Sequence, residues 1–276
     1  MIVSFHPCFY SDKNIICAGR EPDINDLVSI KSADAVILPQ GCKISLYEMA
    51  RENCLHVFPN YDAKFKYPGK TGQIKLFQES GVAHPKSLIF RDLKSFYKKY
   101  PVLSKRGILD FPFVFKFDWG GEGENVFLIK SQHQLESILQ KVSLFEKTGQ
   151  SGFLLQEYIP SENRTLRVVI IGRRIISYWR ILKKRAGFCS NLAKGAVIDF
   201  NSDPDLQQMA IASLKKFCKI SGINLAGFDF LFSSETATVE PLFLEINYFF
   251  GRHGLGGSDR FYKILNDEIK DWINNL

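Results

Sequence analysis

Polar groups interrupt two otherwise apolar runs near the end of the chain, and this feature constrains the fold more than any other. Run 225–232 carries Asp229, and run 241–247 carries Glu245 and Asn247. A carboxylate is costly to bury unless it is paired with a cation or bound to a metal. Residues two apart on a strand project from one face, so Glu245 and Asn247 face the same way, one hairpin from Asp229. We therefore expect a sheet that brings three oxygen ligands together.

These three residues offer oxygen donors and no His or Cys, which suits Mg²⁺ rather than zinc. Mg²⁺ held by few protein ligands usually takes the remaining ones from a nucleotide phosphate. The alternative is a sheet whose acidic residues form salt bridges. We favour a metal site because costly polar groups collect at functional sites, and here three occur on two apolar strands.

The length and composition of the chain indicate a soluble protein with a buried core. Its 276 residues, 45% of them hydrophobic, are ample for a buried core and exceed one small domain. No apolar stretch approaches the roughly 20 residues of a membrane span, and residues 1–7 lack the pattern of a signal peptide. The six cysteines show neither close pairs nor metal-ligand spacing, so we expect buried thiols in the reducing cytoplasm.

The formal net charge of +7 allows a polyanionic partner but does not require one. The longest basic cluster is only three residues, at 183–185, and the others, such as 98–99, are pairs. No aromatic-basic recognition motif accompanies them, so nucleic-acid or acidic-protein binding is a minor alternative. Basic sites for phosphate and carboxylate groups explain the excess equally well.

The chain divides into three units, 1–80, 81–157 and 158–276. In the first, short strands alternate with helical stretches, which predicts a small open parallel sheet. Residues 65–72 are rich in turn formers and indicate a linker before a helix at 71–80. The second and third units mix strands and helices, and a helix from Ser258, which we expect to be its N-cap, closes the chain.

A glycine loop follows the apolar strand that ends at Lys116 and contains Gly120, Gly121 and Gly123. Glycines let backbone amides wrap an anion, and a lysine adds a charge for phosphate. The loop is not a P-loop, because Gly-Lys-Ser/Thr is absent, and a following strand excludes a dinucleotide fingerprint. An ordinary glycine hairpin is the alternative.

Arg167 and Arg180 lie inside apolar strands and therefore need anionic partners. Salt bridges to Asp229 or Glu245 and contacts with a phosphoryl group are equally good explanations. Upstream, segment 156–159 ends a strand before a proline, where freed backbone groups could read an adenine edge or form an ordinary strand end.

The segment 249–258 is distinctive because it carries Arg252 and His253 into a helix N-terminus, where free amides favour an anion. One interpretation is a site for a substrate carboxylate, and the other is a turn with a helix cap. We interpret His253 as a loop side chain rather than a catalytic base.

Taken in order, seven motifs resemble the ATP-grasp ligase superfamily from about Gly69 to the C-terminus. The pattern is closest to the RimK-like branch, which includes ribosomal-protein glutamate ligases and bacterial glutathione synthetases. The motifs are 113–116, 120–123, 156–159, 166–172, 190–196, 227–229 and 244–247.

The resemblance implies an α+β ATP-grasp fold, in which a short N-terminal α/β (pre-ATP-grasp) unit precedes two α+β subdomains that clasp the nucleotide. It implies ATP and Mg²⁺ (or Mn²⁺) as cofactors. Implied roles are nucleotide binding by Lys116, Gly120, Gly121, Gly123, Gln156, Glu157, Tyr158, Ile159 and Glu162, metal binding by Asp229, Glu245 and Asn247, catalysis by Arg167, Arg180 and Asn191, and substrate binding by Arg252, Gly256, Gly257 and Ser258.

Such enzymes phosphorylate a carboxylate and let an amine or thiol attack the acyl phosphate, so we expect a small-molecule or peptide carboxylate and an amine or thiol acceptor as partners. A homo-oligomer is left open. One departure is Thr165, which stands where the family usually carries an acidic residue for the ribose, and Glu162 is the candidate substitute. The alternative is a nucleotide-binding regulatory protein of the same fold with little or no turnover.

Overall fold

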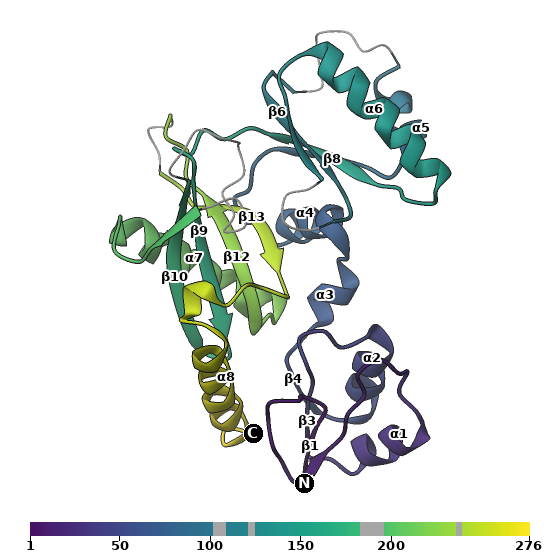
Figure 1. The fold of residues 1–276 in the computed structure, drawn as a ribbon, viewed down its shortest axis with the longest axis vertical. Helices are drawn as coiled ribbons and strands as arrows, with labels where there is room; N and C mark the ends of the chain where they lie inside the picture. The colour runs from purple at the N-terminus through teal and green to yellow at the C-terminus, as the bar shows by residue number, and fades with distance from the viewer. Residues whose placement is uncertain (102–108, 121–124, 183–195, 236–238) are drawn as a thin grey trace.

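The computed structural model describes residues 1–101, 109–120, 125–182, 196–235 and 239–276. Three sheets follow one another along the chain, and each lies within one of the three predicted units (Figure 1). Helices cover the sheets, which makes the fold α+β.

The N-terminal sheet is open and entirely parallel, in the order β2-β1-β3-β4, as the sequence predicted. Parallel strands need crossover connections, and helices supply two of them here. The elements are β1 (Ile2–Ser4), β2 (Lys13–Asn14), α1 (Ile24–Lys31), β3 (Ala35–Ile37), α2 (Ile44–Asn53) and β4 (His56–Phe58).

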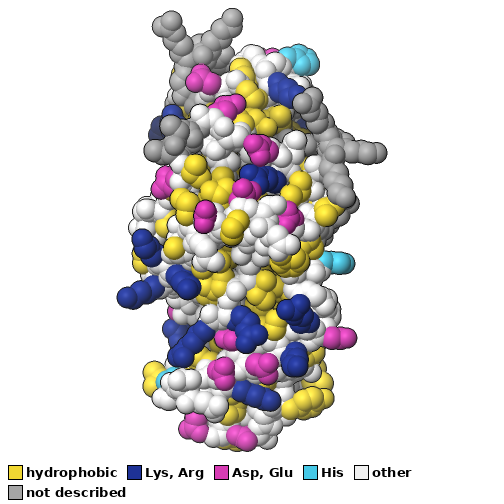
Figure 2. Space-filling model, turned by 90° about the vertical axis from the view of Figure 1, so that its left-hand side faces the viewer, with side chains coloured by type: hydrophobic (Ala, Val, Ile, Leu, Met, Phe, Trp, Pro, Cys, Tyr) yellow, Lys and Arg dark blue, Asp and Glu magenta, His cyan; other side chains and the backbone are white. Residues whose placement is uncertain are grey.

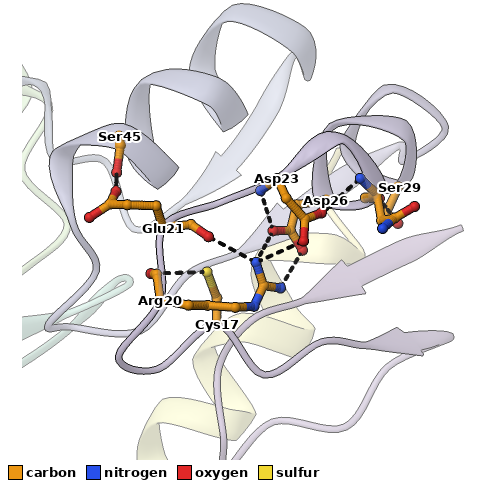
Figure 3. Close-up of polar contacts among 8 residues, drawn as sticks. Cys17, Arg20, Glu21, Asp23, Asp26, Ser29 and Ser45 are labelled. Carbon is orange, nitrogen blue, oxygen red and sulfur yellow. Dashed lines mark hydrogen bonds and ion pairs between the residues drawn. The ribbon is translucent and has the colours of Figure 1, made fainter.

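A polar network fastens the segment before α1 to both helices (Figure 3). The Arg20 guanidinium donates to both oxygens of the buried Asp26 carboxylate, at 2.5 and 2.8 Å. Glu21, the residue after Arg20, accepts from Lys43 Nζ at 2.6 Å and from Ser45 Oγ at 2.5 Å. These contacts fix the chain between β2 and α1, whose Ile15 and Cys17 also pack against the N-terminal core.

The predicted linker at 65–72 is wrong. Helix α3 (Asp62–Lys66) and helix α4 (Gly69–Glu79) occupy most of it. Burial explains the difference, since the ring of Phe77 packs 5.5 Å from that of Phe243 and 5.8 Å from that of Phe217. Tertiary packing thus overrides the local turn signals, and α4, placed by the sequence in the first unit, packs against the third sheet.

The middle sheet is antiparallel, in the order β5-β8-β6-β7, and two helices cover one face (Figure 1). Its core is rich in phenylalanine, with the Phe115 and Phe153 rings stacked at 5.1 Å. The elements are β5 (Ser87–Phe90), α5 (Leu93–Lys99), β6 (Phe113–Phe117), β7 (Val126–Ile129), α6 (Gln132–Lys147) and β8 (Phe153–Glu157).

The third sheet is antiparallel, in the order β11-β10-β9-β12-β13. Alternate residues of its strands enter two different cores: Val168 packs with helix α7, and Val169 with helix α8. The elements are β9 (Arg164–Ile171), β10 (Arg174–Leu182), β11 (Ala196–Asp199), α7 (Pro204–Ser221), β12 (Leu225–Leu231), β13 (Leu242–Asn247), the 3₁₀ helix η2 (His253–Leu255) and α8 (Ser258–Ile273).

The sequence predicted Ser258 as the N-cap of α8, and this prediction is wrong. Gly257 takes that position at φ 93°, a backbone conformation that favours glycine, and its carbonyl accepts from Phe261 N at 3.1 Å. Ser258 begins the helix, and its hydroxyl accepts from Arg252 Nη1 at 3.3 Å.

The N-terminal unit rests on the third unit through α8. The Phe58 and Trp272 rings lie 5.5 Å apart, and Asn60 N donates to Asn224 Oδ1 at 2.9 Å. Phe9 and Ile37 belong to the same hydrophobic cluster as the buried face of α8. This packing places the N-terminal sheet beside the chain that enters α8.

Five of the six cysteines lie in the described residues, and those five are free thiols. Cys42, Cys54 and Cys218 are buried as predicted, whereas Cys8 and Cys17 are partly exposed. Cys189 lies outside the described residues. Within the described ranges, no helix is both long and apolar enough to cross a membrane.

Candidate functional site

A buried ion cluster lies on the α8 face of the third sheet. Asp229 pairs in register with Arg167 on β9 and with Glu245 on β13. Arg167 Nε and Nη2 donate to the two Asp229 oxygens at 2.5 and 2.9 Å, and Arg180 Nη2 lies 2.6 Å from Asp229 Oδ1. Asn247 Nδ2 donates to Asp229 Oδ2 at 3.3 Å. Asn247 thus meets Asp229 as predicted, and Glu245 lies opposite Asp229 on the neighbouring strand.

The two guanidinium groups decide the charge state of Asp229, which is 4% exposed. Burial alone raises the pKa of this carboxyl group. Attraction to Arg167 and Arg180, with their hydrogen bonds, outweighs burial and lowers the pKa of Asp229 to about 2. Asp229 thus stays ionised as the counter-ion of two buried arginines. Of the two explanations offered by the sequence for these arginines, salt bridges are present here, and contact with a phosphoryl group remains a prediction.

The donor set fits a divalent cation in part. Both Asp229 oxygens are engaged by guanidinium and amide hydrogens, so Asp229 could bind a metal only by giving up some of these contacts. Within the described ranges, Glu245 has no ion pair, and Asn247 uses only its amide nitrogen. In the same ranges, no three His, Cys, Asp or Glu side chains form a metal-binding group. Glu245 and Asn247 are therefore the available oxygen donors.

Helix α4 fixes the edge strand that carries these donors. Gln73 Nε2 donates to Ile246 O at 2.8 Å, and Ile246 N donates to Gln73 Oε1 at 2.9 Å. Because β13 is the last strand of its sheet, its outer backbone groups would otherwise lack partners. One glutamine side chain thus holds the backbone between Glu245 and Asn247.

Lys70, which the sequence interpretation missed, joins α4 to the glycine loop. Its ammonium donates to Trp119 O at 3.2 Å and to Gly120 O at 2.8 Å. Burial lowers the pKa of Lys70, while Glu245 and Asp118 act to raise it. Asp118 reinforces the junction by accepting from Thr71 N at 2.7 Å.

A sequence signal for Lys70 existed. The macrodipole disfavours a cation in the first turn of a helix, so a lysine there indicates a nearby anion or acceptor. Assigning 65–72 to a linker concealed this signal. Lys70 is thus a further cation on the glycine-loop side of Glu245.

Replacing Lys70 by alanine is expected to weaken ATP binding about tenfold, or ~1.4 kcal/mol, because the start of the glycine loop loses its tie to α4. Isothermal titration would measure the dissociation constant. Lys75→Ala removes an exposed lysine from the same helix and should bind ATP as the wild type does. If the Lys70→Ala and Lys75→Ala variants bound ATP with equal affinity, the role of Lys70 in nucleotide binding would be contradicted.

The other predicted nucleotide residues lie on the middle sheet and the chain that leaves it. Lys116 on β6 is 8% exposed, and Gly120 has φ 81°, whereas Gly121 and Gly123 lie outside the described residues. Gln156 is buried, and its Nε2 donates to Ser87 Oγ at 2.9 Å. The nucleotide roles of these residues remain predictions.

At the strand end, Glu157 N donates to Lys86 O at 2.8 Å, so this amide is not available to adenine. A backbone contact of Glu157 with adenine would therefore use its carbonyl oxygen, and the contacts at Glu157, Tyr158 and Ile159 remain predictions. Glu162 has φ 53° and pairs with Arg164 at 3.3 Å. Its ribose role remains a prediction and would compete with this ion pair.

Thr165 has a structural role of its own. Its hydroxyl accepts from Arg180 Nε at 3.2 Å and from Nη2 at 3.0 Å. An acidic residue here would add a second carboxylate beside Arg180, which already pairs with Asp229. Asn191, the remaining predicted catalytic residue, lies outside the described residues.

The predicted substrate residues come together in the turn before α8. Gly256 and Gly257 both have positive φ, at 83° and 93°, and Arg252 contacts Ser258 across the turn. The ring of Tyr178 fills the space beside Gly254, where an added Cβ would lie 2.1 Å from a ring carbon. The turn is therefore tightly packed on the ion-cluster face. A turn that leads into a helix and a site for a substrate carboxylate are compatible interpretations of this segment.

Comparisons with known proteins show the family and the fold of the chain. The family model of the RimK-like ATP-grasp domain matches residues 69–273. A search of curated protein sequences finds no match.

Among solved structures, a RimK-domain ATP-grasp protein from Sphaerobacter thermophilus has a TM-score of 0.59 at 11% identity, covering 97% of this chain and 98% of its own. D-alanine–D-alanine ligase from Bacillus anthracis, complexed with ATP, has a TM-score of 0.57 at 15% identity, covering 94% and 84%. The ADP complex of purK, N5-carboxyaminoimidazole ribonucleotide synthetase, has a TM-score of 0.60 at 13% identity, covering 86% of this chain. This chain spans 59% of the purK chain. At such identities the likeness shows the fold.

Proposed function

Because the chain belongs to the RimK-like ATP-grasp family, we propose that it is an ATP- and Mg²⁺-dependent ligase that forms an amide or thioester through an acyl phosphate. The observation that carries this proposal is the ion cluster beside the glycine loop. Arg167 and Arg180 are held on one sheet face. Helix α4 holds β13 through Gln73 and contacts the loop through Lys70. Cations gathered around acidic oxygen donors suit phosphoryl transfer.

The chemistry needs positioning and charge more than a nucleophilic side chain. A carboxylate oxygen of the substrate would attack the γ-phosphorus of ATP, with ADP leaving, and an amine or thiol would then displace phosphate. Arg167 and Arg180 would neutralise the transferred phosphoryl oxygens by sharing their guanidinium hydrogens with them and Asp229. Mg²⁺, for which Glu245 and Asn247 supply free oxygens, would add positive charge at the phosphates when bound.

Two observations favour the regulatory alternative. Thr165 replaces the acidic residue expected for the ribose, and Asp229 is fully engaged by arginines. A protein of this kind would bind ATP and release little ADP. Measuring ADP release with pools of carboxylates, amines and thiols separates the two functions, because only the ligase shows release that depends on both substrates.

Nucleic-acid binding is the other alternative. On the face shown in Figure 2, Lys and Arg side chains gather in the lower half, with Asp, Glu and apolar side chains among them. Binding of nucleic acid through phosphates would fall steeply with salt and would not depend on ATP.

Mg-ATP is expected to raise the melting temperature. A ligand bound only by the folded state adds RT ln(1 + [L]/Kd), about 2.7 kcal/mol at a hundredfold excess over Kd. Differential scanning fluorimetry would show the rise, and ATP with EDTA would give a much smaller one. An unchanged melting temperature at saturating Mg-ATP concentrations would contradict nucleotide binding.

A further inference from the structure

The segment that follows β13 crosses the carboxyl edge of the N-terminal parallel sheet. Tyr248 O accepts from Gln40 Nε2 at 3.4 Å, just beyond β3. Four residues later comes Arg252, and His6 lies just beyond β1. Both side chains contact the ring of Tyr262. Open α/β sheets bind ligands beyond the carboxyl ends of their strands. The chain leaving Asn247 thus connects the ion cluster with such an edge.

Arg252 is held rigidly at this junction. Its guanidinium carbon lies 4.9 Å from the ring centre of Phe261 and 4.5 Å from that of Tyr262, and Nη1 contacts Ser258 Oγ. No Asp or Glu in the described part of the chain forms an ion pair with it. A guanidinium fixed on two aromatic faces presents its planar fork to a carboxylate with little loss of side-chain entropy.

His6 adds a neutral donor. It is 8% exposed, and its Nδ1 accepts from Cys8 N at 3.1 Å, which places the proton of the neutral ring on Nε2. Burial, and then the charge of Arg252, lower the pKa of His6 to about 4, so the ring is neutral near pH 7. Among the described residues, Nε2 has no hydrogen-bond acceptor. Within the described residues, Tyr61 Oη is the only buried side-chain polar atom without a partner, so Nε2 is reached by solvent, and its N–H can donate to an acceptor oxygen on a ligand.

We propose that Arg252 and His6 together form a subsite for a carboxylate of the acceptor substrate. The acceptor is then a molecule that carries a carboxylate in addition to its reacting amine or thiol. This inference rests on the proposed ligase function, and it extends the substrate site from the turn before α8 to the N-terminal unit. Arg252 would supply charge and paired hydrogen bonds, and His6 a third, uncharged hydrogen bond.

Succinate and succinamide are suitable probes, because they share a carbon chain and differ in charge. The chain has five histidines, so ring resonances are resolvable by NMR, and His6→Gln identifies the His6 signals. With saturating Mg²⁺ and a non-hydrolysable ATP analogue, succinate should shift the His6 resonances saturably, and succinamide should not. Arg252→Gln should weaken succinate binding at least about tenfold.

Arg173→Gln is the matched control, since it removes an exposed guanidinium from the β9–β10 turn. It should bind succinate like the wild type. If Arg252→Gln does not fold, Arg252→Lys serves, because it keeps the charge but loses the planar fork and should also bind more weakly. Equal shifts from both probes, no shift of His6 with succinate, or equal affinity of the Arg252 and Arg173 variants would overturn the subsite.

Failure of the ligase function gives a different result. A protein that binds succinate at His6 but releases no ADP with any substrate pool keeps the subsite and loses the proposed reaction. Conversely, if the protein releases ADP when substrates are present while succinate leaves the His6 resonances unchanged, that result would support the ligase reaction and refute the subsite.

Discussion

Replacing Asp229 by asparagine is expected to lower the free energy of unfolding by about 3–5 kcal/mol. The change removes the counter-ion of two arginines, Arg167 and Arg180, which are 6% and 9% exposed. Both arginines are buried and lie on inner strands of the sheet, so their guanidinium groups would stay buried on its face. An uncompensated buried cation is costly, and here there would be two. Urea unfolding of the two proteins would measure the difference.

Asp271→Asn is the control, since it removes an exposed carboxylate from α8 and should change stability little. The pH dependence provides a second check. The pKa of Asp229 is lowered from 3.8 to about 2. The ion pairs therefore contribute fully above the unfolded pKa, and the contribution is lost as pH falls through the folded pKa. The difference in free energy of unfolding between the wild type and Asp229→Asn should therefore shrink as the pH falls from about 4 towards about 2. Near-equal free energies of unfolding at pH 7 would contradict the stabilising role of the ion cluster.

The arrangement of the third sheet was accessible from the sequence because its strands are long and apolar. Arg167 and Asp229 stood out because each is charged within such a run. Sequence alone could not choose between salt bridge and phosphate for Arg167, since both satisfy the same guanidinium. Strand register decides the question for the protein without ligand, by placing Asp229 directly opposite Arg167.

The parts that escaped prediction depend on contacts between distant segments. The helix predicted at 71–80 is confirmed as α4, but its start at Gly69, among turn-forming residues, was missed, because Phe77 packing on the third sheet is revealed by no local pattern. Gln73 and Ile246, which hydrogen-bond to each other, are 173 positions apart in the sequence. His6 and Arg252 come together only because the N-terminal sheet rests on α8. Local patterns specify elements, whereas the packing of one unit on another sets these junctions.

Replacing Glu245 by glutamine is expected to reduce substrate-dependent ADP release at least about 100-fold, or ~2.7 kcal/mol of activation free energy. The change keeps the shape of the side chain and removes one negative charge from the proposed metal donors. A metal held by fewer charges binds more weakly and stabilises phosphoryl transfer less. ATP should still bind through Lys116, Lys70 and the chain beyond β8. Turnover and melting temperature are to be measured on the same preparation.

The melting temperature separates this role from a structural one. If Glu245 were the counter-ion of a buried arginine, its loss would destabilise the fold, but Arg167 and Arg180 both pair with Asp229 instead. We therefore expect Glu245→Gln to melt close to the wild type. Glu240→Gln, at an exposed position just before β13, should preserve both turnover and stability. A large fall in melting temperature with normal residual activity would refute the metal role, because it would show that Glu245 acts on the fold and not on the reaction.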